Sequence, residues 1–238
     1  MINGVLVLAR ISKSELTKLE IIRVATRMFL EQGYTTTTIK NICDELSMSA
    51  GNLTFYFHSK EHLLATLVEM CCDFQWKMMK EELKAHSSPL EALCLELMAM
   101  MAICEENEVA KDFYISAYTS PMSLDIIRKS DAKRAKTVFG EYCPQFSDED
   151  FAAAEVIVSG VEYSGMMTTE FGAPLDKRIR ATLDTVMAVY GVPCDTRKST
   201  IDEILKTDYR KVGRRVLGEF RKYVEEVNEQ AFLDLIKG

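Results

Sequence analysis

Apolar residues recur at every third or fourth position along most of the chain, a spacing typical of helices that bury one face. The first such stripe runs from Ile21 to Phe29, and Gly33 follows as a helix-ending residue. Two short apolar stretches come next, at residues 39–46 and 50–57, each directly after a hydroxyl residue that can cap a helix. The three residues that separate them, 47–49, predict a helix-turn-helix.

Longer helices are expected around this pair. The first helix is expected to begin at a capping box that joins Thr17 and Glu20, and a fourth helix is expected to run from Ser59 toward Ala85. Similar signals predict helices over residues 90–104, 109–119, 121–142, 147–171 and 175–191. A second capping box, at residues 200–203, predicts the start of a last long helix. The expected fold class is therefore all-α.

Composition agrees with this expectation. The 238 residues include 11 glycines and 5 prolines, fewer turn formers than average usage supplies, while strong helix formers abound. The apolar stretches 90–104 and 151–169 contain glutamates, so we expect no membrane span. Residues 1–10 show no secretory signal and are expected to form a loose arm. The seven cysteines lack metal or disulfide spacing, which predicts buried thiols in a reducing cytoplasm, and no cofactor is expected.

The charge is unevenly distributed along the chain. A net charge of −7 speaks against a nucleic-acid-binding protein, because phosphate contacts need lysine and arginine. Residues 1–60, however, contain seven basic and five acidic side chains, so the remaining residues carry all of the negative excess. One end of the molecule is therefore able to approach DNA, while the rest is not.

Residues 28–63 resemble the DNA-binding domain of the TetR (tetracycline repressor) family of bacterial transcription regulators. The resemblance extends over about 36 positions and lies in residue type and spacing at Phe29, Gly33, Tyr34, Thr37, Thr38, Ile39, Ile42, Ser49, Gly51, Leu53, Tyr56, Phe57, Ser59, Lys60, Glu61 and Leu63. It implies a DNA-binding domain at 1–60 and a helical ligand-binding and dimerisation domain at 61–238. The implied function is a homodimeric repressor that binds near-palindromic operator DNA and responds to a small molecule.

The resemblance also implies which residues contact DNA. Phosphate contacts are expected from Thr37, Thr38, Tyr56 and Lys60, which position the protein without reading sequence. Base contacts are expected from the first turns of the third helix, at Ser49, Ala50, Asn52 and Phe55, and the Asn52 amide is suited to adenine.

Two residues depart from the family pattern. Ser47 replaces a usual glycine, at a cost of about 1–2 kcal/mol if the turn is left-handed. Thr54 replaces a usual tyrosine or phenylalanine and offers only a hydroxyl for phosphate.

The ligand pocket is expected among the fourth to eighth helices. Aromatic and sulfur-containing side chains are its candidate lining, with ordinary core packing as the alternative for each: Trp76, Met79, Met100, Cys104, Tyr114, Tyr118, Phe139 and Tyr163. Such a lining predicts a small hydrophobic or weakly cationic effector. Small residues along 151–171 allow two helices to pack closely. The resemblance implies a homodimer interface formed by this helix and the helix 175–191, and packing within the chain is the alternative.

Other interpretations remain open at this stage. An all-α enzyme is one, although no nucleophile with an adjacent base, metal motif or phosphate loop is evident. A small-molecule or partner-binding module with weakened DNA binding is another, suggested by Ser47 and Thr54. The pair His58 and His62 is interpreted as surface residues rather than metal ligands or a catalytic pair. The basic residues after position 205 alternate with acidic ones and predict a solvated, ion-paired helix face.

Overall fold

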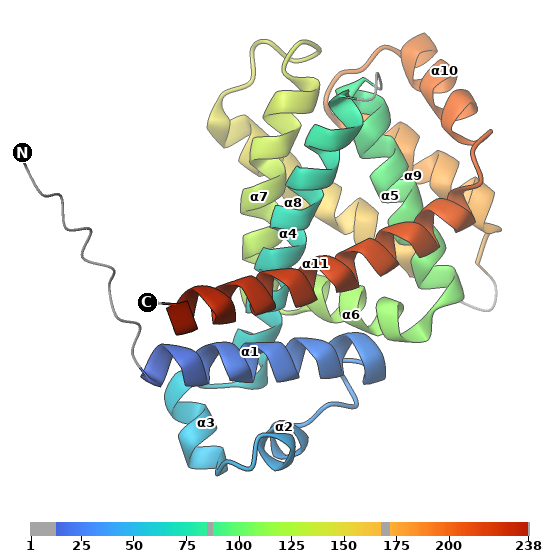
Figure 1. Cartoon of the computed structure of the whole chain (residues 1–238). Helices are drawn as coiled ribbons and strands as arrows, with labels where there is room; N and C mark the ends of the chain where they lie inside the picture. Colours follow the sequence, from blue (N-terminus) through green and yellow to red (C-terminus); the bar gives the residue numbers. More distant parts are fainter. Residues whose placement is uncertain (1–12, 85–87, 168–171, 238) are drawn as a thin grey trace, which may run out of the picture.

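The computed structural model describes residues 13–84, 88–167 and 172–237, and within these ranges it contains helices and no strand (Figure 1). The fold class predicted from the sequence is confirmed. The helices are α1 (Lys13–Gln32), α2 (Ile39–Glu45), α3 (Ala50–Tyr56), α4 (Lys60–Lys84), α5 (Pro89–Glu106), α6 (Glu108–Thr119), α7 (Pro121–Phe139), α8 (Asp148–Met166), α9 (Leu175–Val189), α10 (Cys194–Ile204) and α11 (Tyr209–Lys237).

Helices α2 and α3 project from one end of the molecule, beneath α1 in Figure 1. They are held there by a small apolar core in which Phe29 of α1, Ile42 of α2 and Leu53 of α3 are all fully buried. Removing such side chains from water is the main stabilising contribution for helices as short as seven residues, which are unstable on their own.

Helix α5 forms the centre of the larger part of the molecule. It is the most apolar helix, and every residue from Leu97 to Cys104 is buried. Helices α4, α6, α7, α8, α9, α10 and α11 all pack against it. A helix that is apolar on all sides needs neighbours on all sides, and this places α5 where the surrounding helices meet.

The last helix connects the two parts of the molecule. Helix α11 lies beside α1 and crosses α5 (Figure 1). Arg221 donates a hydrogen bond of 2.5 Å from Nη2 to the carbonyl oxygen of Leu30, near the end of α1. At Gly213 the crossing is so close that a Cβ atom would lie 3.0 Å from the carbonyl oxygen of Ala99. A side chain at position 213 would therefore push α11 away from α5.

Several helix boundaries differ from those predicted. Helix α1 begins before Thr17, whose hydroxyl donates to the carbonyl of Lys13 within the helix, so the predicted capping box there is wrong. Thr200 likewise lies inside α10, and the last helix starts only at Tyr209. Asp208 caps it by accepting from the backbone N–H of Lys211 at 3.1 Å. A capping sequence does not start a helix when the residues before it can also be helical.

Other start signals are confirmed. Ser88 caps α5 with Pro89 at its first position, and Ser147 caps α8 reciprocally with Asp150. Helix α7 ends earlier than expected, at Phe139. The expected end of the eighth helix, at residue 171, and the expected arm at residues 1–10 fall outside the described residues.

All seven cysteines are described as free thiols, and each of them except Cys194 is buried. Burial raises the pKa of the Cys94 and Cys104 thiols to about 12, since the thiolate loses its hydration. Among the described helices, none combines the length and the apolar character needed to cross a bilayer.

Candidate nucleic-acid interface and buried polar cavity

Two side-chain caps and one strained residue set the geometry of the helix-turn-helix. The Thr38 hydroxyl accepts a 3.1 Å hydrogen bond from the backbone N–H of Asn41, and Ser49 caps α3 in the same way through Asn52 at 3.2 Å. Between the two helices, Ser47 has a φ of 51°, in the left-handed region that glycine adopts without strain. The turn therefore needs the conformation that the glycine of the family pattern would supply.

Helix α3 buries one face and exposes the other. Leu53 points into the small core, whereas Asn52, Thr54 and Phe55 are exposed, and the Phe55 ring retains 74% of its accessible surface. Ala50 and Ser49 are exposed beside them. The residues expected to read bases thus lie together on one open surface, which is the arrangement that a helix needs to enter the major groove.

The residues expected to contact phosphate differ in their exposure to solvent. Thr38 is exposed at the start of α2, and Tyr56 is half-buried with its ring edge-on to Phe55, 5.1 Å between centroids. The Thr54 hydroxyl donates to the carbonyl of Gly51 at 3.1 Å. Thr37, in contrast, is fully buried and its hydroxyl donates to the Gly33 carbonyl at 2.7 Å, so the expectation that it points toward DNA is corrected.

Lys60 has a bracing role that the sequence did not reveal. Its ammonium group donates to the carbonyl oxygens of Tyr34 at 2.9 Å and Thr37 at 3.0 Å, and it lies 4.1 Å from the centre of the Tyr34 ring. The first residue of α4 is thereby tied to the loop between α1 and α2. These contacts join the start of α4 to the segment that leads into the helix-turn-helix.

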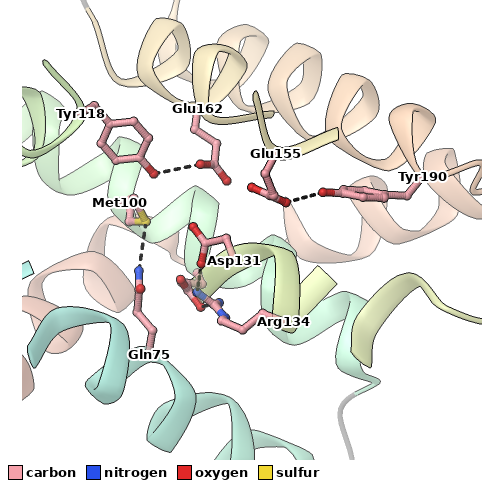
Figure 2. A network of polar contacts seen from close by, with 9 residues as sticks. Gln75, Met100, Tyr118, Asp131, Arg134, Glu155, Glu162 and Tyr190 are labelled. Carbon is pink, nitrogen blue, oxygen red and sulfur yellow. Dashed lines mark hydrogen bonds and ion pairs between the residues drawn. The ribbon is translucent and has the colours of Figure 1, made fainter. Parts of the chain in front are cut away.

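A second group of polar side chains lies deep in the larger part of the molecule, around a narrow cavity (Figure 2). The cavity measures about 20 Å³ as the space open to the centre of a water molecule, which is room for about one water. Its lining combines charged, aromatic and apolar side chains from α4 to α9 and the residue after α9. The polar and aromatic members are Gln75, Glu96, Tyr118, Asp131, Arg134, Phe139, Glu155, Glu162 and Tyr190.

Arg134 is the central cation of this cavity and is only 2% exposed. Its Nη2 atom pairs with Glu96 of α5, and its Nη1 atom lies 3.1 Å from Asp131, one turn earlier on α7. Two carboxylates thus compensate one guanidinium out of contact with bulk water. Pairs of this kind contribute little net stability, but loss of one partner leaves a costly uncompensated charge.

Glu155 and Glu162 lie two turns apart on α8 and both point into the cavity (Figure 2). Each accepts a hydrogen bond from a tyrosine hydroxyl, Glu162 from Tyr118 at 2.8 Å and Glu155 from Tyr190. Burial raises the pKa of Glu155 to about 7 and that of Glu162 well above its usual range. Oε2 of Glu155 and Nε of Arg134 are buried with no hydrogen-bond partner.

The expected ligand residues agree only in part with this cavity. Met100, Tyr118 and Phe139 line it, and Tyr114 lines an adjoining hollow shared with Met100 and Tyr118. Trp76, Cys104 and Tyr163 line neither space, whereas the Met79 side chain is outside the described part of the structure.

The five charged residues of the lining were not predicted from the sequence, and the cavity is more polar than expected. The signal available was the presence of carboxylates in the most apolar helices, at Glu96, Glu155 and Glu162.

A third feature is an open surface formed by α8 and α9. Val156 and Ile157 remain 50% and 59% exposed there, beside Gly160 and Ser164 and opposite Thr182 and Thr185 of α9. A Cβ atom added at Gly160 would meet nothing within 4 Å. Apolar side chains exposed next to small residues are typical of a surface that another protein chain covers.

An exposed, capped helix that follows a short turn after another helix is the arrangement of a DNA-binding helix-turn-helix. Residues 21–67 match the family model described as "Bacterial regulatory proteins, tetR family". The resemblance predicted from the sequence is thereby confirmed over these residues. The curated relatives that match the chain are named as transcription regulators.

Individual relatives match over limited lengths. The HTH-type transcriptional regulator HbdR of Aromatoleum sp. (strain CIB) is 32% identical over 118 residues, half of each chain. The HTH-type transcriptional repressor KstR2 of Mycolicibacterium smegmatis is 27% identical over 95 residues, 40% of this chain and 46% of the relative. The matches therefore span about half the length of these relatives. The crystal structure of RolR with resorcinol superposes with a TM-score of 0.64 at 18% identity, covering 79% of this chain and 94% of RolR.

Proposed function

We propose that the protein is a homodimeric repressor that binds a near-palindromic operator through α3 and releases it when a small molecule occupies the buried cavity. The observation that carries this proposal is the exposed face of α3, where Asn52 and Phe55 lie in the open between capped helix ends. The same end of the chain, residues 1–60, has more basic than acidic side chains, seven against five. A repressor among the relatives supports the direction of control.

The surface of α8 and α9 supports the proposed dimer. Burying Val156 and Ile157 against a second copy would remove apolar area from water, at about 25 cal/mol per Å². The small residues Gly160 and Ser164 allow two helices to approach closely. Two-fold symmetry would set the two α3 helices about 34–36 Å apart, one turn of B-DNA, or a multiple of it.

Helix α4 supports the proposed coupling between cavity and DNA. At its first residue Lys60 holds the α1–α2 loop, and two-thirds of the way along it Gln75 lines the cavity. The Gln75 amide also lies 3.8 Å from the sulfur of Met100 on α5. Because the cavity has room for about one water, a larger ligand must displace the surrounding helices, and α4 transmits that displacement. RolR, which shares the fold, was crystallised with the small molecule resorcinol.

Gel-shift titration with the DNA upstream of the protein's own gene tests operator recognition. We expect Asn52→Ala to lose about 1–3 kcal/mol of discrimination at one base pair. Gln145→Ala, which removes an exposed amide in the turn between α7 and α8, is the matched control and should leave binding unchanged. Equal losses on operator and random DNA for Asn52→Ala would contradict base reading by this residue.

Sedimentation tests the dimer separately. Ile157→Asp places a charge in the middle of the exposed α8 surface and should produce monomers with weakened operator binding. Met122→Asp changes another exposed apolar residue, on α7, and should leave the assembly intact. A wild-type protein that stays monomeric at high micromolar concentration would rule out the proposed interface.

A further inference from the structure

The cavity contains more acidic groups than its basic group can balance. Glu96, Asp131, Glu155 and Glu162 face it, against the single guanidinium of Arg134. Arg134 is already engaged by Glu96 and Asp131. The acidic groups left without a basic partner are therefore Glu155 and Glu162 of α8, which are 2% and 7% exposed. Burial raises the pKa of both, so a cation that binds there would displace a proton.

An unfilled hydrogen-bonding position accompanies this surplus. Oε2 of Glu155 is buried and accepts no hydrogen bond, although its Oε1 atom is bonded by the Tyr190 hydroxyl. Leaving a buried acceptor unsatisfied is costly, and native structures seldom do so without a reason. The unsatisfied oxygen of Glu155 and the imbalance of acidic and basic groups are separate observations. Each favours a bound group that donates hydrogen bonds.

The excess of acidic over basic groups favours a cationic hydrogen-bond donor over a neutral one. Tyr118 and Tyr190 already supply a neutral hydroxyl to each of the two glutamates, and neither hydroxyl can compensate the charge of an ionised carboxylate. An ammonium group donates hydrogen bonds and also compensates charge, whereas an anion would face four carboxyls. The free nitrogen Nε of Arg134 does not alter this balance, because the guanidinium charge is matched by its two carboxylate partners.

The walls of the cavity suit an ammonium group on an aromatic or aliphatic frame. The rings of Phe139 and Tyr190 are stacked with centroids 4.3 Å apart, next to Val158 and Val186. Aromatic faces attract cations, and apolar walls favour a hydrocarbon frame. An ammonium head is about the size of the one water for which the present cavity has room.

We propose that the effector is a compact organic cation, whose ammonium group binds Glu155 and Glu162 while its apolar frame packs against Phe139 and Tyr190. This inference rests on the proposed function in taking the cavity as the effector site. It assigns the ligand class to residues on α8 that the sequence pattern did not single out.

Calorimetric titration of the full chain with matched probes tests the ligand class. Benzylamine and 2-phenylethylamine are compared with benzyl alcohol and 2-phenylethanol, which have the same frames without the charge, and with resorcinol. We expect at least one amine to bind about tenfold or more tightly than its own alcohol. The proposal is overturned if neither amine binds better than its alcohol, the result expected of a cavity that holds only water, or if resorcinol binds as tightly as the better amine.

Variants tie the preference to α8. Glu155→Gln and Glu162→Gln keep the side-chain shape and should reduce the preference for the amine about tenfold or more, with little effect on alcohol binding. Glu69→Gln makes the same charge change at an exposed position of α4 and should keep the full preference. Thermal unfolding of each variant shows that it is folded, and the wild-type comparison alone remains decisive if a variant is not. An unchanged preference in both folded variants overturns the assignment.

Operator binding is measured in parallel by gel shift. Failure of the amine to bind, with operator binding intact, overturns the ligand class alone. Tight amine binding that leaves the operator complex undisturbed supports the ligand class and contradicts the coupling between cavity and DNA.

Discussion

The exposed face of α3 and the buried cavity are both built from polar side chains, but they differ in solvation. On α3, Asn52 and Thr54 are exposed to water, and their polar groups need no partner inside the fold. In the cavity, Arg134 and Glu155 are already withdrawn from water and depend on their neighbours. Substitutions on α3 should therefore alter binding and spare stability, whereas substitutions in the cavity should alter stability first.

The largest expected effect comes from removing the central cation of the cavity. Arg134→Leu leaves Glu96 and Asp131 buried without their partner and should lower the free energy of unfolding by about 3–5 kcal/mol. Arg27→Leu, which breaks an exposed pair with Glu45, should cost about 0–1 kcal/mol. Urea denaturation measures both, and similar losses would remove the distinction between the two regions.

The next effect is a pH dependence of stability. The pKa of Glu155 rises from 4.5 when unfolded to about 7 when folded, so between these values the folded protein binds the proton more tightly. The free energy of unfolding should therefore fall by about 3 kcal/mol from this group as pH rises through that interval. Glu155→Gln should remove this part of the slope in denaturation curves recorded from pH 4 to pH 8.

The groups that act on Glu155 belong to α7, α8 and the end of α9. Burial raises its pKa most, and the charged or hydroxyl groups that modify it are Asp131, Glu162, Arg134, Arg128 and Tyr190. An identical pH slope in wild type and Glu155→Gln would show that another of these groups dominates.

A smaller and opposite effect is expected in the turn before α3. Ser47→Gly removes the strain of a side chain at a φ of 51° and should raise the free energy of unfolding by about 1 kcal/mol. Ser47→Ala keeps a Cβ atom and should bring no gain. A glycine variant no more stable than the alanine variant would mean that the turn tolerates serine without strain.

The smallest effect on stability is expected on the recognition surface itself. Phe55→Ser removes a ring that is 74% exposed and should change the free energy of unfolding by less than about 0.5 kcal/mol. Operator affinity should nevertheless fall, because the ring lies on the face of α3 that we propose contacts DNA. A large loss of stability would show that Phe55 supports the fold rather than the interface.

The same contrast explains what the sequence could predict. The helix-turn-helix follows from neighbours in the chain, since caps such as Ser49 and core positions such as Leu53 act within a few residues. Helix start signals were reliable where a proline or an apolar turn confirmed them, as at Pro89, and misleading at Thr17, where helix continues in both directions.

The cavity depends on contacts that sequence spacing does not reveal. Arg134 meets Glu96 across 38 positions, and Tyr190 meets Glu155 across 35. Individually these residues resemble surface charges, and only the packing of α5, α7 and α8 makes them buried. The placement of Lys60 was unpredictable for the same reason, because its partners lie 23 and 26 residues earlier, on the far side of the helix-turn-helix.

The burial of six cysteines and the exposure of Cys194 at the start of α10 make the molecule selective toward thiol reagents. A maleimide or nitroxide label attaches fastest to an exposed thiol, while the raised pKa of Cys94 and Cys104 slows reaction at buried ones. The unaltered protein thus provides one exposed cysteine per chain to which a label for spectroscopic distance measurement can be attached. In a two-fold assembly, the distance between two such labels would report subunit rearrangement in solution without any engineered residue.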